Sequence, residues 1–332
     1  MSRVDEAFQN VNRDEFVLRE DGSIVIQSTA SNAIKSGLEM LDVKEGSRVL
    51  EIGTGSGFSG ALLSYLAGSS GTVVSLDIEP ELTRRARELF KQKNITNVRF
   101  ETKDGREGFE SEAPYDRIIA WATPEHIPDA WKDQVSNGGI LVTPFRVLPI
   151  ARCTVTVSLR KVDGVLKGES VSGEGYIMMS SEPIQDIEKF AGYQIHADLI
   201  GKGEDPVWAS SIWMKQFQGK EWLERFDAMQ SETSPFQEKG EEIRAYLLGK
   251  NPEGFTYAFH PDSGYWVGYS SPDGFALVSE RQPKQWVVTD KIHKDVLCDW
   301  WDDWKRLGKP SYEQLQPYMA GNQIKVKLKG GV

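Results

Sequence analysis

The chain is poor in cysteine and histidine, the side chains on which disulfide frameworks and most zinc sites depend. Only two cysteines occur among 332 residues, Cys153 and Cys298, and the four histidines are scattered. No spacing of these residues fits a set of metal ligands, and two distant cysteines do not make a disulfide framework. We therefore expect no metal site and a reduced, cytoplasmic setting.

Long apolar runs and basic patches are also missing. No stretch approaches the roughly 20 apolar residues of a membrane helix, and acidic Asp5 and Glu6 stand where a signal peptide has its apolar core. The net charge of −10 is spread over two acidic halves, so neither a membrane nor nucleic acid is an expected partner. The hydrophobic (39%) and charged (27%) contents are typical of a soluble globular protein. A length of 332 residues is sufficient for two domains.

The most informative stretch that is present is a glycine-rich loop after a short apolar run. Residues 51–57 read Glu-Ile-Gly-Thr-Gly-Ser-Gly, and a second apolar run, 72–76, ends at Asp77. The loop has neither the Gly-x-Gly-x-x-Gly spacing of dinucleotide sites nor the Gly-Lys-Ser/Thr of phosphate loops. An acidic residue at the tip of the next strand can accept hydrogen bonds from both ribose hydroxyls. The pattern therefore resembles motif I of S-adenosylmethionine (SAM)-dependent methyltransferases, which bind a nucleoside without phosphate.

Alternating strands and helices surround this loop. Strands are expected at 48–52, 72–77, 98–102, 115–121 and 140–144, with helices at 59–66, 80–92 and 127–134 between them. This order predicts an α/β fold of the Rossmann-like methyltransferase type, a mostly parallel sheet with helices on both faces. Residues 151–180 are expected to add antiparallel strands. Asp104 and Gly105 follow the third strand, where a carboxylate can accept a hydrogen bond from an adenine amino group.

A change of character near residue 182 predicts a second domain. Residues 183–332 contain eight of the ten tryptophans, which we interpret mainly as packing residues. We expect helices at 209–229, 235–249 and 296–307, short strands between 255 and 289, and a last strand at 323–328. The division is thus 1–182 for the methyltransferase domain and 183–332 for a smaller α+β domain that recognises substrate or has another accessory role.

The first domain resembles the protein-L-isoaspartate O-methyltransferase family in a run of ordered motifs. These are 3–8 and 13–17 near the start, then Asp104-Gly105-Arg106-Glu107-Gly108-Phe109, Ala113-Pro114-Tyr115-Asp116, Ala122-Thr123-Pro124, Ile127-Pro128 and 138–144. The resemblance implies SAM as methyl donor, S-adenosylhomocysteine as product, and a peptide or protein acceptor bearing aspartate or isoaspartate. It implies donor contacts from the glycine loop and the next two strand ends: Glu51, Gly53, Thr54, Gly55, Gly57, Asp77, Ile78, Asp104 and Gly105.

The resemblance also places a catalytic hydroxyl ahead of the glycine loop. Counting back without gaps from Leu50 puts Thr29 at this position, and Ser28 and Ser31 are close enough to compete. The alternative is that Ser28 and Thr29 only cap the helix that begins near residue 31. Because an aspartyl carboxylate with a pKa of about 4 is already ionised at neutral pH, the hydroxyl has only to orient it, and no general base is needed.

Departures from the family pattern favour a specialised acceptor. Ser31 replaces a proline of the repair enzymes, Asn32 replaces an aromatic residue or histidine, and the segment from Phe16 to Thr29 is shorter. Together with the second domain, this layout resembles enzymes that tailor ribosomally made peptides such as lanthipeptides and graspetides. Those enzymes methylate a defined aspartate, whose ester cyclises to an aspartimide and can open to isoaspartate. Three alternatives remain: an isoaspartyl repair enzyme, a methyltransferase of a peptide C-terminal carboxylate, and a non-catalytic SAM- or peptide-binding module.

Overall fold

The computed structural model describes residues 1–183, 196–203, 205–216, 219–281 and 284–330. The chain forms two compact units, and neither is continuous in sequence. The first unit comprises Met1–Phe145, Val155–Gly192 and Pro317–Ile324, and the second comprises Arg146–Thr154, Tyr193–Gln316 and Lys325–Val332. No helix in the described part of the chain is long and apolar enough to cross a membrane.

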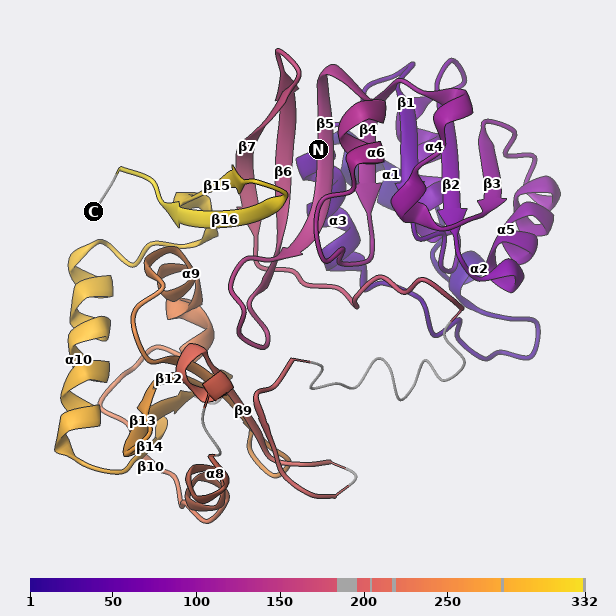
Figure 1. Ribbon diagram of the computed structural model, residues 1–332. Coiled ribbons are helices and arrows are strands. Elements are labelled where there is room, and N and C mark those ends of the chain that lie inside the picture. Colours follow the sequence, from indigo (N-terminus) through magenta and orange to yellow (C-terminus); the bar gives the residue numbers. More distant parts are fainter. Residues whose placement is uncertain (184–195, 204, 217–218, 282–283, 331–332) are drawn as a thin grey trace. The chain divides into compact units, whose positions relative to one another are not determined.

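The first unit is built on a seven-stranded sheet in the order β3-β2-β1-β4-β5-β6-β7 (Figure 1). The strands from β3 to β5 pair in parallel, and β6 pairs with β7 in antiparallel register. Their bounds are β1 Arg48–Ile52, β2 Thr72–Asp77, β3 Val98–Thr102, β4 Tyr115–Ala120, β5 Val135–Arg146, β6 Thr154–Val162 and β7 Val165–Ser172. The predicted Rossmann-like methyltransferase fold is therefore confirmed.

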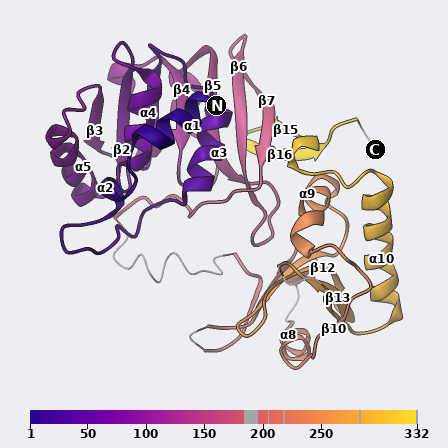
Figure 2. The same cartoon turned by 180° about the vertical axis from the view of Figure 1, so that it is seen from behind.

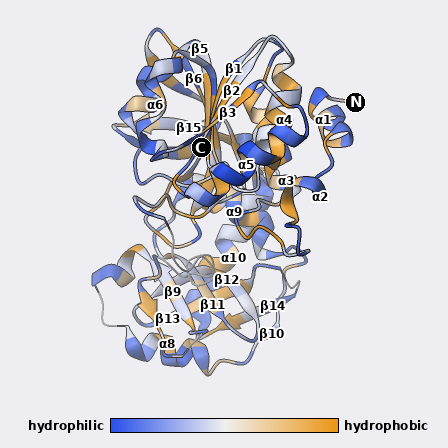
Figure 3. Ribbon diagram, turned by 90° about the vertical axis from the view of Figure 1, so that its right-hand side faces the viewer, coloured by the Kyte–Doolittle hydropathy of each residue, from blue (hydrophilic) through white to orange (hydrophobic). Residues whose placement is uncertain are grey.

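Helices cover both faces of this sheet. Four of them share one apolar core with the strands: α1 (Arg3–Asn10), α3 (Ser31–Leu41), α4 (Phe58–Ala67) and α5 (Pro80–Gln92). Figure 2 shows α1, α3 and α4 over this face, whereas α6 (Asp129–Gln134) lies over the opposite face in Figure 1. Short α2 (Asp14–Val17) adds two buried side chains. In Figure 3, apolar colour follows the central strands and hydrophilic colour marks the outside of α5.

The second unit contains an antiparallel sheet in the order β10-β14-β13-β12-β11-β9-β8. Its strands are β8 Leu199–Ile200, β9 Trp208–Ser211, β10 Glu232–Thr233, β11 Phe255–His260, β12 Gly264–Ser271, β13 Gly274–Ser279 and β14 Gln285–Val288. Helices α8 (Lys220–Asp227), α9 (Gly240–Lys250) and α10 (Lys291–Arg306) accompany it. The strands β15 (Leu315–Ala320) and β16 (Gln323–Leu328) pair with each other, and their residues are divided between the two units, since Pro317–Ile324 belongs to the first. The additional antiparallel domain confirms the expected α+β character.

One secondary-structure prediction in this unit is wrong. The segment expected to be helical from residue 209 begins as β9, whose four residues are all buried and pair with β11. An apolar run of this length has no periodicity that separates a buried strand from a helix, and pairing with β11 decides between them. Tryptophans 222, 266, 301 and 304 are almost fully buried, which agrees with their interpretation as packing residues.

Candidate functional site

The first unit contains a cavity of about 400 Å³ at the carboxyl ends of its central strands. The carboxyl ends of β1 and β2 contribute Ile52, Leu76 and Asp77, and the residues that follow β1, β2 and β4 contribute the glycine segment, residues 78–79 and Trp121. Two segments distant in sequence complete the wall: residues 26–30 ahead of α3, and residues 174–180 after β7. A cavity at this edge of a parallel sheet is where ligands of open α/β folds bind.

The glycines of the loop are required by its backbone. Gly53, Gly55 and Gly57 all have positive φ, at 99°, 50° and 86°, a region that residues with a Cβ seldom adopt. A Cβ on Gly55 would also collide with the carbonyl oxygen of Gln27. Gly57 is the residue before α4, so the loop leads directly from the end of β1 into the N-terminus of this helix. The loop thus brings its backbone to the ligand at close range.

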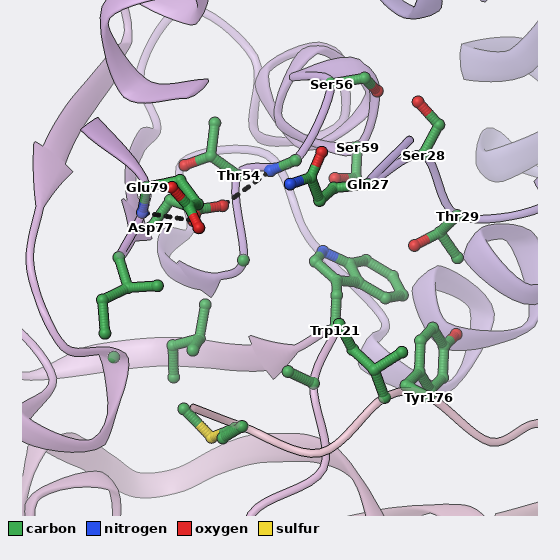
Figure 4. A pocket seen from close by; sticks show the side chains of 18 of the residues that line it. Gln27, Ser28, Thr29, Thr54, Ser56, Ser59, Asp77, Glu79, Trp121 and Tyr176 are labelled. Atoms are coloured by element: carbon green, nitrogen blue, oxygen red, sulfur yellow. Dashed lines mark hydrogen bonds between the residues drawn. The ribbon is translucent and has the colours of Figure 1, made fainter. Parts of the chain in front are cut away.

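Asp77 stands at the end of β2 with both carboxylate oxygens held by backbone donors. The amide of Gly55 donates to Oδ2 and the amide of Glu79 donates to Oδ1, each at 3.0 Å (Figure 4). Burial raises the pKa of Asp77 above its ordinary value, against the opposing effect of these two hydrogen bonds. Each carboxylate oxygen keeps a further acceptor position. Asp77 is therefore positioned to accept two hydrogen bonds from a vicinal diol.

Glu51, the first residue of the loop motif, is fully buried beneath the cavity. Its carboxylate accepts hydrogen bonds from the hydroxyls of Ser59 (2.5 Å) and Ser75 (2.6 Å) and from the indole nitrogen of Trp121 (2.9 Å). Burial raises the pKa of Glu51 to about 7, although these three donors oppose the shift. Glu51 is not among the lining residues, so its role is to fix the loop, α4 and Trp121 relative to one another.

Two hydroxyls ahead of α3 line the other end of the cavity, those of Ser28 and Thr29. In Figure 4 the Thr29 hydroxyl is directed at Trp121, whereas the Ser28 hydroxyl is turned away from it. The Ser28 oxygen is buried and has no hydrogen-bond partner. Ala30 is the N-cap of α3, and no side chain caps this helix. The hydroxyls of Ser28 and Thr29 are therefore not used as helix caps.

The segment from Glu174 to Ser180 lines the cavity, although no sequence motif marks it as part of a site. Thr123 holds this segment: its amide donates to the carbonyl of Ile177 (2.7 Å), its carbonyl accepts from the amide of Met179 (2.8 Å), and its hydroxyl donates to the carbonyl of Tyr176 (2.8 Å). The Tyr176 hydroxyl in turn donates to the carbonyl of Ala33 at 3.2 Å. The expected antiparallel strands therefore end at Ser172, and the following residues form a wall of the site.

The structure brings most of the predicted site residues together. The cavity is lined by Ser28, Thr29, Gly53, Thr54, Gly55, Asp77, Ile78 and Gly105, whereas Glu51, Gly57, Ser31 and Asp104 are not lining residues. Asp104 forms a two-pronged ion pair with Arg106, which lowers the pKa of this carboxylate. An adenine contact from Asp104 stays a prediction, and the carboxylate would have to share its acceptor positions with Arg106.

Sequence comparison matches residues 1–182 to the family described as protein-L-isoaspartate(D-aspartate) O-methyltransferase (PCMT). A protein-L-isoaspartate O-methyltransferase of Ignicoccus hospitalis is 34% identical over 157 residues, which cover 44% of this chain and 74% of that protein. Several other curated relatives are matched over 48% to 56% of their length, so the chain spans about half of these proteins.

Two solved structures are similar to this chain. A protein-L-isoaspartate O-methyltransferase structure aligns with a TM-score of 0.52 and 18% identity over 99% of this chain and 95% of that chain. A second structure, described as a putative enzyme of this kind from Plasmodium falciparum in complex with S-adenosyl-L-homocysteine, has a TM-score of 0.48 and 17% identity over 55% of this chain and 92% of that chain. At 18% identity the likeness to the first structure concerns the fold alone, and its alignment covers residues of both units.

Proposed function

Because the chain belongs to the protein-L-isoaspartate(D-aspartate) O-methyltransferase family, whose members are SAM-dependent carboxyl O-methyltransferases, we propose that it methylates an isoaspartyl carboxylate in a peptide or protein. The single observation that carries the proposal is the cavity of the first unit, which places Asp77 and the glycine loop at one end and two hydroxyls at the other. The first end has groups that can bind the nucleoside of a methyl donor, and the second has hydroxyls that can bind an acceptor carboxylate.

The donor set of the cavity fits SAM, the methyl donor of this family. The carboxylate of Asp77 can accept hydrogen bonds from a diol, and only glycine fits at position 55 of the loop that approaches the ligand. No lysine or arginine that could bind a phosphate occurs among the described lining residues. We assign Asp77 to the ribose and the loop residues 53–55 to the methionyl part. When bound, SAM supplies a methyl group on a cationic sulfur. The residues of this chain then have only to align the acceptor and exclude water.

Thr29 is the residue we assign to the acceptor carboxylate. Its hydroxyl faces the interior of the cavity toward Trp121 (Figure 4), and a single neutral donor orients an anion without holding it so strongly that the oxygen loses nucleophilicity. Ser28, with a buried and unpartnered hydroxyl next to it, is the second donor available. After transfer, the backbone nitrogen that follows the esterified residue attacks the ester carbonyl. A nitrogen–carbon bond forms, the bond to the methoxy group breaks, and methanol leaves with the amide proton.

A second candidate acceptor is a defined aspartate in a ribosomally made peptide. Departures from the repair-enzyme pattern favour it: Ser31 and Asn32 follow directly on Ala30 of the cavity wall, and the segment ahead of Thr29 is shorter. The second unit is no longer an argument for this specialisation, since a solved isoaspartate methyltransferase aligns over almost the whole chain. Recognition of the acceptor by the second unit also remains a proposal.

Mass spectrometry of peptides incubated with the protein and SAM tests the function. We use one generic peptide with isoaspartate at a single position and its twin with ordinary aspartate. Methyl ester or succinimide on the isoaspartyl peptide alone supports the proposal. No reaction with either peptide, combined with methylation of a modified peptide encoded beside the gene, would replace it with the tailoring function. SAM binding without turnover on any carboxylate would leave a binding module.

A further inference from the structure

Trp121 stands between the two ends of the cavity. In Figure 4 its indole lies between Asp77 on one side and Thr29 on the other. The residue follows β4 directly and lines the cavity, although it is only 8% exposed. If the nucleoside lies at Asp77 and the acceptor at Thr29, as proposed above, the sulfur and its methyl group must pass beside this ring.

The indole is held in one orientation. Its nitrogen donates to Glu51, which is itself fixed by Ser59 and Ser75 at the bottom of the site. The ring of Tyr176 lies against it with centroids 5.8 Å apart and planes inclined by 51°. An aromatic side chain whose polar atom is satisfied on the buried side presents carbon surface to the cavity. The arrangement therefore fixes an aromatic surface where the reacting atoms meet.

Space for the indole is made by a glycine inside a helix. Gly37 lies in the middle of α3, and a Cβ there would come within 2.9 Å of Cζ3 of Trp121. Glycine in a helix interior lowers helix stability, so its presence here has to be explained by what packs against it. A glycine on α3 thus accommodates the six-membered part of this ring.

The charges of the cavity favour a cation beside the ring. Among its described lining residues, Asp77, Glu79 and Glu174 are acidic, and none is lysine, arginine or histidine. An indole face attracts cations through its quadrupole, more strongly than the rings of Phe or Tyr do. We propose that the face of Trp121 binds the sulfonium of SAM by a cation–π contact and thereby discriminates the charged donor from its uncharged product, S-adenosylhomocysteine.

Calorimetric titration of both ligands measures this discrimination without any acceptor. The measurement is made near pH 6, so that Glu51, with its pKa of about 7, is mostly uncharged. Trp121→Leu keeps an apolar side chain, although a smaller one, and removes the ring; we expect the ratio of SAM to S-adenosylhomocysteine affinities to fall about 2- to 30-fold. Trp121→Phe keeps a weaker ring, and we expect an intermediate ratio. Circular dichroism confirms that each variant is folded, and Trp121→Phe decides the question if the leucine variant is not.

Two control variants separate the effect of the Trp121 ring on ligand affinity from the effects of its neighbours. Glu51→Gln retains an acceptor for the indole nitrogen and abolishes the carboxylate charge, and Tyr176→Phe retains the neighbouring ring without its hydroxyl. Both are expected to keep the wild-type affinity ratio. If the Trp121 variants weaken both ligands equally, the indole has a packing role only and the inference is overturned. If Glu51→Gln lowers the ratio as much as Trp121→Leu does, the carboxylate, not the ring, discriminates.

A failure of the proposed sulfonium contact can be distinguished from a failure of the proposed function. A protein that does not methylate an isoaspartyl peptide but shows the predicted ligand ratios would retain the sulfonium contact and lose only the acceptor assignment. A protein that methylates the peptide but binds SAM and S-adenosylhomocysteine with ratios unaffected by Trp121→Leu would retain the function and lose the contact.

Discussion

Gly55 and Gln27 are in such close contact that only a glycine fits at position 55: a Cβ would meet the carbonyl oxygen of Gln27. The contact joins the glycine loop to the segment that carries the two hydroxyls, which is separated from it by α3 and β1. The donor end and the acceptor end of the cavity are therefore not independent, because a displacement of residue 55 displaces residues 27–29 as well.

The first prediction follows from this contact. Gly55→Ala should reduce SAM affinity by at least about tenfold, because the loop has to move away from Gln27 and because the backbone of an alanine would have to keep a positive φ. Isothermal titration measures the affinity. Gly22→Ala is the matched control, since Gly22 also has a positive φ (83°) but its Cβ would have no neighbour within 4 Å. That variant should lose about 1–2 kcal/mol of stability and bind SAM normally. Equal affinities for both variants would contradict the argument.

Much of the first unit is predictable because each of its elements has a local signal. The strands 48–52, 72–77 and 98–102 and the helix 80–92 have the predicted bounds, since apolar runs alternate with an amphipathic helix that begins at Pro80. The glycine loop and Asp77 are predictable for the same reason: the glycines follow one another in a short segment, and Asp77 directly follows an apolar run.

The residues that were missed have no such local signal. Tyr176 and its neighbours belong to a segment without periodicity, and their position depends on hydrogen bonds to Thr123, which is about fifty residues earlier. Trp121 follows an apolar strand, and its sequence context is that of a core residue, whereas in the structure its side chain lines the cavity. The return of Pro317–Ile324 to the first unit, where the carbonyl of Asn322 accepts from the amide of Ile127 (3.1 Å), likewise depends on tertiary contacts.

The second prediction concerns the ribose contact. Asp77→Ala removes an acceptor for two hydroxyls and also leaves the amides of Gly55 and Glu79 without their partner. Since each hydrogen bond to a charged group contributes about 1.5–3 kcal/mol, SAM affinity should fall roughly 10- to 100-fold or more. Asp104→Asn provides the comparison, because that carboxylate is engaged by Arg106 outside the lining residues, and we expect a smaller loss. Unchanged SAM affinity of Asp77→Ala would remove Asp77 from the site.

The third prediction separates the two hydroxyls by steady-state kinetics. Thr29→Val keeps the side-chain volume and removes the donor, so kcat should fall about 10- to 100-fold while the SAM dissociation constant changes little. Ser28→Ala removes a buried hydroxyl that has no partner in the protein, and it should leave stability unchanged or slightly higher. If Thr29→Val is fully active and Ser28→Ala is inactive, the acceptor is oriented by Ser28, and the gapless count from Leu50 is one residue off.

The fourth prediction links Glu51 to the pH dependence of stability. Its pKa is raised from 4.5 to about 7 in the folded protein because burial penalises the charged form. The folded state therefore holds this proton more tightly than the unfolded state does. The stability that the protonated Glu51 contributes is fully present below pH 4.5 and is lost as the pH rises through about 7, by about 3 kcal/mol. Above pH 7 the cost of the buried charge stays constant.

Glu51→Gln isolates this contribution, because glutamine keeps the shape and an acceptor for Trp121 but does not titrate. We expect the free energy of unfolding of the wild type, measured by urea denaturation, to decline relative to the variant between pH 4.5 and pH 7 and to run parallel to it at higher pH. The difference between the two curves cancels all other titrating groups to first order. Parallel curves over the whole range would mean that the three donors around Glu51 compensate its burial, and that the carboxylate is ionised throughout.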